Sequence, residues 1–272
     1  HIISNGVRSW MLGVTLGLAT RAPVKGRTAR YYRQLTRLSA AFSFTSDLVL
    51  VLLGGRFKFK EKLSGRLADA LIHLYMGSAV LKRFEDDGRP VEDLPFLTWA
   101  MDDSLYHIQE SLRGVLSNFP IPGIGRLVKW IVFPWGLPYA PPSDRTGKDV
   151  AHLLLTENES RDRLVSGVYL SDQEDASGQV QTAFHLVLTA TRAESAISNA
   201  LNEPVTFENH EALVQKAVES GVITEEQATT VRLAQEAARA VIEVDEFTRA
   251  EIEGYDEPAF RPAADPGRAT QA

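Results

Sequence analysis

The chain has 272 residues, 44% of them hydrophobic and 24% charged, which is ordinary for a globular protein with one large domain or two small ones. Its net charge of −6 argues against a general nucleic-acid binder, and the absence of cysteine excludes disulfides, thiolate nucleophiles and zinc–thiolate sites. It begins at His1 without a secretory signal pattern, so we expect a piece of a longer protein.

Three long helices are predicted in the first half, because apolar residues recur there at steps of three and four. The first has the stripe Tyr31, Leu35, Leu38, Phe42, Thr45, Val49 and Leu52, and should end at Gly54-Gly55. The second has Leu63, Leu67, Ala70, Leu74, Gly77, Leu81 and Phe84. The third starts near Asp93 and has Leu97, Met101, Leu105, Ile108, Leu112 and Leu116. Residues 7–19 can supply a fourth helix, and the short turns favour an antiparallel bundle.

The chain changes character at "IGRLVKWIVFPWGLPYAPPSD", which is dense in aromatic residues and proline. Shorter helices are predicted at about 149–156, 159–167, 178–201, 208–219 and 224–242. The last of them should start at Thr224, with Gln227 completing a capping box. The remainder is rich in Pro, Gly and Ala and is predicted to be a disordered tail.

Strand signals are almost absent, so the predicted fold is all-α: an antiparallel helical bundle, then shorter helices, then the tail. The expected domains are a helical bundle at 1–120, an aromatic and Pro-rich connector at 121–142, a small helical region at 143–247 and a flexible tail at 248–272. The uninterrupted apolar run at 48–53 is far shorter than the roughly 20 residues that cross a bilayer, which favours a buried bundle helix.

Motifs for chemistry are weak. Gly-rich nucleotide fingerprints and the GxSxG elbow are missing. "HIQE", with His107 and Glu110, has neither the Glu-x-x-His order nor the facing glutamates of a carboxylate-bridged metal site. The acidic pairs Asp86-Asp87 and Asp102-Asp103 are expected to lie on solvated faces. We therefore predict no catalytic, cofactor-binding or metal-ligating residue in this chain.

Two segments mix aromatic and basic residues. The run "RFKFKEK" at 56–62 could contact anionic lipid or phosphate, although a solvated helix start is the favoured interpretation. The stronger surface candidate is the segment 124–139, with Lys129, Trp130, Phe133, Trp135 and Tyr139. Its composition suits a membrane interface and equally a buried inter-domain linker. Both alternatives stay open at this point.

Longer stretches resemble a known family. "RYYRQLTRLSAAFSFTSDLVLVLLGG", followed by "KEKLSGRLADALIHLYMGSAVLKRFEDDGRPVEDLP", is similar to the C-terminal part of the long bacterial acyl-CoA dehydrogenases. "PSDRTGKDVAHLLLTENESRDRL" and "SGVITEEQATTVRLAQEAARAVIEVDEF" continue the similarity, which is weaker in "SGQVQTAFHLVLTATRAESAISNALN" and excludes the tail. "RLADALIHLY" also resembles the helical region behind the catalytic core of very-long-chain members.

The resemblance implies an FAD-dependent enzyme of fatty acid β-oxidation that converts medium- to long-chain acyl-CoA into trans-2-enoyl-CoA. In that family a glutamate removes the α-proton, the flavin takes the β-hydride, and the glutamate and most flavin contacts lie upstream of "HIISNGVRS". No catalytic residue is transferred, so this chain alone is expected to be inactive and free of FAD. Its implied role is that of a scaffold, an assembly element or a membrane-facing surface.

The implied partners are the upstream catalytic domain, the acyl-CoA substrate and an electron acceptor, with no nucleic acid. The implied localisation is cytoplasmic, with peripheral contact at the inner membrane. The alternative function, from a different class, is a stand-alone helical interaction module without catalysis.

Overall fold

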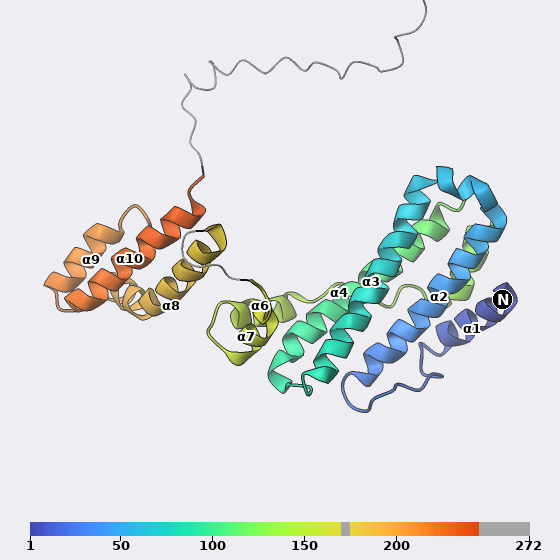
Figure 1. Ribbon diagram of the computed structural model, residues 1–272, viewed down its shortest axis with the longest axis horizontal. Coiled ribbons are helices and arrows are strands. Elements are labelled where there is room, and N and C mark those ends of the chain that lie inside the picture. The colour runs from blue at the N-terminus through green and yellow to red at the C-terminus, as the bar shows by residue number, and fades with distance from the viewer. Residues whose placement is uncertain (170–174, 245–272) are drawn as a thin grey trace, which may run out of the picture. The chain divides into compact units, whose positions relative to one another are not determined.

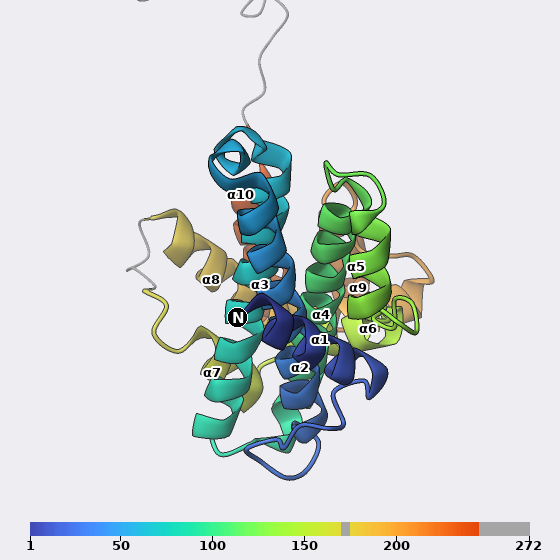
Figure 2. The ribbon, with the colours of Figure 1, turned by 90° about the vertical axis from the view of Figure 1, so that its right-hand side faces the viewer.

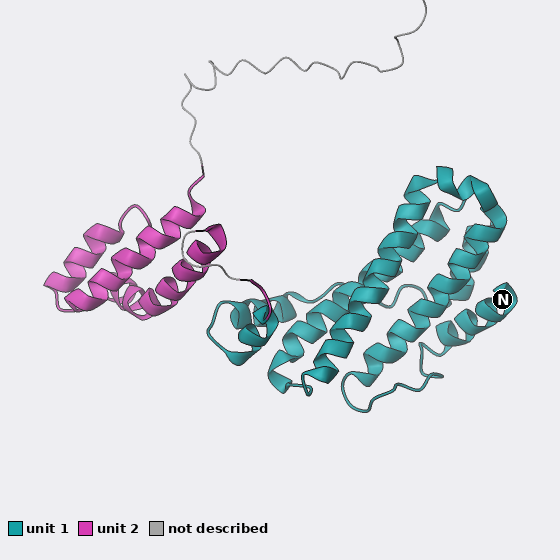
Figure 3. Ribbon diagram, in the orientation of Figure 1, with its two compact units in different colours: residues 1–166 teal, residues 167–272 magenta. Residues whose placement is uncertain are grey.

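The computed structural model describes residues 1–169 and 175–244, which form ten α-helices, two short 3-10 helices and no strand (Figure 1). This confirms the predicted all-α fold for the described part of the chain. The chain divides into two compact units, residues 1–166 and 167–272 (Figure 3). The tail predicted at 248–272 lies outside the described residues.

Three long helices form the centre of unit 1: α2 (Ala29–Leu53), α3 (Glu61–Asp86) and α4 (Leu94–Ser117). They lie side by side in both views (Figures 1 and 2). The 3-10 helices η1 (Gly54–Phe59) and η2 (Val91–Asp93) connect them. The largest apolar side chains that this centre buries completely are Leu38, Leu81, Met101, Leu105, Ile108 and Leu112. Because each helix contributes buried apolar side chains to one cluster, the bundle has a single core.

The predicted stripes of α3 and α4 are confirmed at every position, since all seven residues of the first and all six of the second are buried. The stripe of α2 is partly wrong. Phe44 and Leu53 are buried there, whereas Phe42 is only half-buried and Leu52 is 39% exposed. A neighbouring helix causes the difference at Phe44, because Gly6 of α1 packs against the Phe44 ring.

Helix α1 (Ile2–Val14) and helix α5 (Ile124–Val132) complete the bundle. Asn5 of α1 donates a hydrogen bond of 2.7 Å to the Asp47 carboxylate of α2. Helix α5, which the sequence did not predict, packs against the end of α4 at Gly125. A Cβ atom on Gly125 would lie 2.0 Å from the carbonyl oxygen of Leu116, so the two backbones meet directly.

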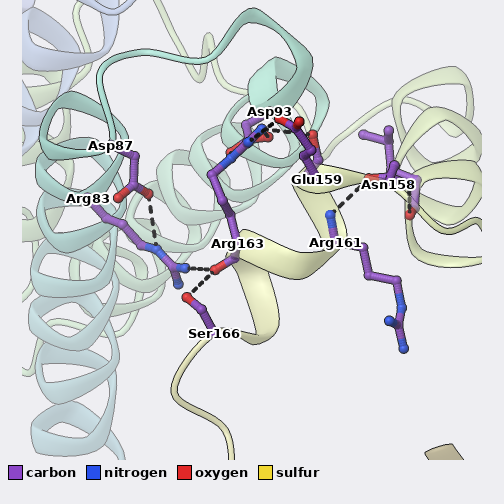
Figure 4. A network of polar contacts seen from close by, with 10 residues as sticks. Arg83, Asp87, Asp93, Asn158, Glu159, Arg161, Arg163 and Ser166 are labelled. Atoms are coloured by element: carbon purple, nitrogen blue, oxygen red, sulfur yellow. Dashed lines mark hydrogen bonds and ion pairs between the residues drawn. The ribbon is translucent and has the colours of Figure 1, made fainter.

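The short helices α6 (Asp144–Leu154) and α7 (Glu159–Val165) also belong to unit 1. Arg163 of α7 forms a two-point ion pair with Asp93 at the start of α4, with contacts of 2.8 and 3.1 Å (Figure 4). Burial opposes ionisation of Asp93, but hydrogen bonds from Arg163 and Ser160 lower its pKa overall. Arg83 of α3 also donates to the Arg163 carbonyl. These contacts attach α7 to the bundle.

Unit 2 contains α8 (Ala176–Leu201), α9 (His210–Glu219) and α10 (Glu225–Ile242), packed around Ile197, Val214 and Val231. The predicted capping box at Thr224 is confirmed: its hydroxyl accepts from Gln227 N, and the Gln227 side chain accepts from Thr224 N. Unit 2 thus has its own small core.

A stacked histidine pair lies across the interface between α3 and α4. The rings of His73 and His107 are 4.7 Å apart at an interplanar angle of 15°. The Nδ1 atom of His73 is buried without a hydrogen-bond partner. Burial lowers the pKa of His73 and the His107 ring lowers it further, although the carboxylates of Asp103 and Asp69 oppose both effects.

The lowered pKa of His73 predicts that the bundle loses stability in acid. Because the folded-state pKa of His73 lies below its unfolded value of about 6.5, the unfolded chain binds the proton more tightly. Stability should therefore be complete above that pH and decrease as the pH falls through it towards the folded-state value. Urea unfolding followed by tryptophan fluorescence measures the effect in unit 1, where all four tryptophans lie. His73→Gln should reduce this pH dependence, and His152→Gln, at an exposed histidine, should not.

Candidate functional site

The connector at 121–142 is joined to the bundle through a buried arginine. Arg37 of α2 is 1% exposed, and its Nη1 donates a 3.0 Å hydrogen bond to the Tyr139 hydroxyl. The guanidinium lies over the rings of Tyr139, at 5.4 Å, and Phe133, at 5.9 Å. Its Nε and Nη2 atoms have no hydrogen-bond partner among the described residues. The two aromatic faces therefore contribute to the stabilisation of this buried charge.

A buried glutamine makes a second attachment at the same place. The Gln109 side chain of α4 donates to the Tyr139 carbonyl at 2.8 Å and accepts from the Tyr139 N–H at 3.0 Å. Gln109 is 1% exposed. Burial raises the pKa of Tyr139, against the opposing effect of Arg37, so the phenol stays protonated at neutral pH. Arg37 and Gln109 together fix the position of Tyr139.

The five predicted surface residues separate into two groups. Phe133 is buried and Tyr139 is half-buried against the core, where both meet Arg37. Trp130 and Trp135 are 61% and 68% exposed, and Lys129 is half-buried. The structure thus brings Phe133 and Tyr139 together and leaves the two tryptophans on the surface. The sequence analysis missed Arg37 and Gln109, although each directly adjoins a stripe residue, Leu38 or Ile108.

The exposed Trp135 ring is nevertheless held in place. Its indole N–H donates a 2.9 Å hydrogen bond to the carbonyl of Val14, the last residue of α1. Gly13 lies beside Pro134, where an added Cβ would be 3.0 Å from the proline Cδ. The connector therefore also contacts the end of α1, and the Trp135 position is defined by a polar contact.

The other sequence candidates have structural partners. His107 lies 3.4 Å from the Asp103 carboxylate, whereas Glu110 pairs with Arg113 at 2.5 Å. In the part of the chain that the structure describes, no three His, Asp or Glu side chains are placed to hold a metal ion.

The expectation that both acidic pairs lie on solvated faces is wrong for Asp102. It is half-buried and accepts a 3.2 Å hydrogen bond from the Tyr31 hydroxyl, and burial raises its pKa. The pair Asp86-Asp87 is exposed as predicted.

The double hydrogen bond of Gln109 gives a stability prediction. Gln109→Leu keeps the side-chain volume but leaves the Tyr139 N–H and C=O unpaired, which should lower the free energy of unfolding of unit 1 by about 1–3 kcal/mol. Tryptophan fluorescence in urea measures this change. Lys148→Leu, at an exposed lysine of α6 in the same unit, is the control and should have little effect. An unchanged midpoint for Gln109→Leu would contradict the proposed attachment.

A known protein family matches most of the chain. The family described as acyl-CoA dehydrogenase, C-terminal, bacterial type, matches residues 1–247. That range contains every helix described above, the connector, all of unit 1 and the described helices of unit 2. No solved structure matches the chain. The match covers most of the sequence and confirms the resemblance stated from the sequence: the chain belongs to the bacterial-type C-terminal family of acyl-CoA dehydrogenases.

Proposed function

We propose that this chain is the helical scaffold of an FAD-dependent acyl-CoA dehydrogenase that oxidises medium- to long-chain acyl-CoA to trans-2-enoyl-CoA. The family match over residues 1–247 carries the proposal. In this proposal the reacting groups and FAD belong to an upstream catalytic domain of the same protein, which passes electrons to a separate acceptor. The chain contributes support and docking surfaces in the cytoplasm.

Two hollows of unit 1 support the placement of FAD outside this chain. The apolar pocket between α3, α4 and α7 has a volume of about 160 Å³, less than the roughly 300–1,000 Å³ of typical ligand sites. A wider hollow of about 540 Å³ is open and is lined by the exposed side chains of Phe59, Lys60 and Lys62. Neither offers an enclosed apolar slot for a ring system. We therefore derive no reaction step within this chain.

The outer face of α1 is the proposed contact with the catalytic domain. Ile3, Val7 and Trp10 follow each other at helical spacing and are 83%, 53% and 42% exposed. The opposite face of α1 is buried in the bundle. An apolar face of this kind on a helix that is already packed on its other side is typical of an interface.

The exposed part of the connector is the proposed peripheral membrane contact. Leu127 and Trp130 share one face of α5 and are each 61% exposed, with Lys129 and Arg126 nearby in the sequence. Tryptophan and basic residues together suit the headgroup region of an anionic bilayer. Phe133 and Tyr139 face the core and would not take part. The stretch Ala29–Phe59 is long and apolar enough to span a membrane, and 39% of its apolar window is buried inside the structure.

The α1 contact predicts a domain-dependent defect. In the complete enzyme, Val7→Glu should weaken the contact with the catalytic domain and reduce dehydrogenase activity and FAD retention. Leu71→Glu is the matched control, because Leu71 of α3 is 54% exposed, almost the same as Val7. In the 272-residue chain alone, the free energy of unfolding of each variant should lie within about 0.5 kcal/mol of the value for the unchanged chain.

Two results would contradict the proposal. One is equal activity of the Val7→Glu and Leu71→Glu enzymes. The other is stoichiometric FAD or acyl-CoA oxidation in the isolated 272-residue chain, which would place the reacting groups within it.

The membrane contact predicts a loss of liposome binding. Leu127→Ser/Trp130→Ser should reduce co-sedimentation of the complete enzyme with anionic liposomes, because the two exposed apolar side chains on α5 are removed. Trp99→Ser, at a tryptophan of α4 that is 41% exposed, is the control and should co-sediment as before. If the double variant co-sediments with the liposomes as much as the unchanged enzyme does, the exposed face of α5 is not a membrane contact.

A further inference from the structure

The first 46 residues of this acidic chain carry basic side chains without any acidic ones. Residues 1–46 contain seven of the 29 Lys and Arg residues and none of the 35 Asp and Glu residues. Four of the seven, Arg21, Lys25, Arg27 and Arg30, lie exposed between the end of α1 and the first turn of α2. This surface therefore attracts anions despite the overall charge of −6.

A pocket of about 240 Å³ opens within this surface, where the beginning of α2 meets the beginning of α4. Its wall combines two guanidinium groups, two hydroxyl groups and two leucines. The lining residues are Arg27, Arg30, Tyr31, Leu94, Leu97 and Thr98. No carboxylate is among them, so the polar part of the wall favours an acceptor-rich ligand.

The Arg30 guanidinium is held in place by the ring and hydroxyl of Tyr31, and its charge also acts on the nearby Asp102 carboxylate. It lies 4.4 Å from the centre of the Tyr31 ring, and its Nη2 donates a 2.5 Å hydrogen bond to the Tyr31 hydroxyl. That hydroxyl donates to Asp102, the acid in contact with this cluster, and burial raises the pKa of Asp102. Arg30 is thus positioned in advance, which lowers the entropic cost of binding an anion.

Arg27 forms no ion pair with any residue that the structure describes, and it lies directly before the Thr28 cap of α2. The Thr28 hydroxyl donates to Glu85, and Glu85 pairs with Arg89, so this acid is already engaged. The charge of Arg27 is therefore available to a ligand in the pocket.

We propose that this pocket binds a phosphate group. Two guanidinium groups can each donate to phosphate oxygens, and the Thr98 hydroxyl adds a further polar group beside them. Leu94 and Leu97 give the pocket an apolar side, which suits a phosphate ester with a carbon chain as well as free phosphate. The shared chemistry is the phosphate dianion, and a lipid headgroup and inorganic phosphate are its two sources. This proposal does not depend on the proposed dehydrogenase function.

Titration of the 272-residue chain with inorganic phosphate by calorimetry, at constant ionic strength set with chloride, tests the site. Saturable binding is expected. Arg27→Gln should weaken it about tenfold, the loss of one charge-assisted contact. Arg21→Gln is the matched control, since it removes the same charge from the same loop outside the pocket. Thr98→Val, a second variant on α4, removes the hydroxyl beside the two guanidinium groups and should also weaken phosphate binding. Far-ultraviolet circular dichroism checks that each variant is folded.

Vesicles distinguish the two sources. If a headgroup occupies the pocket, the chain should sediment with phosphatidic acid in phosphatidylcholine, inorganic phosphate should compete, and Arg27→Gln should reduce sedimentation. Binding of inorganic phosphate without sedimentation would assign the pocket to a soluble phosphate. The proposal is overturned if phosphate shows no saturable binding, or if Arg21→Gln weakens binding as much as Arg27→Gln, because the attraction would then be diffuse.

Discussion

The close contact between α2, α3 and α4 is the constraint on which unit 1 depends. Gly77 of α3 lies within this contact, where an added Cβ atom would be 3.3 Å from the Leu35 side chain of α2 and 3.5 Å from Met101 of α4. At that separation the apolar stripes of the three helices interdigitate and exclude water. The packing also fixes where polar groups on these helices can be buried, and the contacts of Arg37 and Gln109 follow from it.

The buried Arg37 changes the interpretation of the aromatic connector. Composition alone allowed a membrane surface or a buried linker, and in the structure one part of the segment is buried and another is exposed. Phe133 and Tyr139 surround a cation inside the bundle, while Trp130 and Trp135 remain outside. Removing a cation from water is costly without a partner, so the aromatic rings are part of what makes this arrangement stable. The connector is therefore an integral part of unit 1.

Local periodicity predicted the long helices and the buried faces of α3 and α4, because each of those faces is a regular stripe along one helix. It failed where a distant segment decides burial, as at Phe44 beneath Gly6. Helix α5 was missed because its neighbouring aromatic residues and prolines obscure a short apolar pattern. The contact between Arg37 and Tyr139 joins residues 102 positions apart, and the pocket at Arg27 joins two helices, so neither is visible in any short window of sequence.

The meeting of α4 and α5 at Gly125 limits how relatives of this chain can diverge. Since any side chain at this position would collide with the Leu116 carbonyl, replacing the glycine requires the two helices to move apart locally by more than an ångström. Such a shift would disturb the packing of Val128 and Val132, the other buried residues of α5. Evolution at this site is thus restricted to a single amino acid unless many neighbours change at once, and an alignment of the family should show this position nearly invariant even where the surrounding surface varies freely.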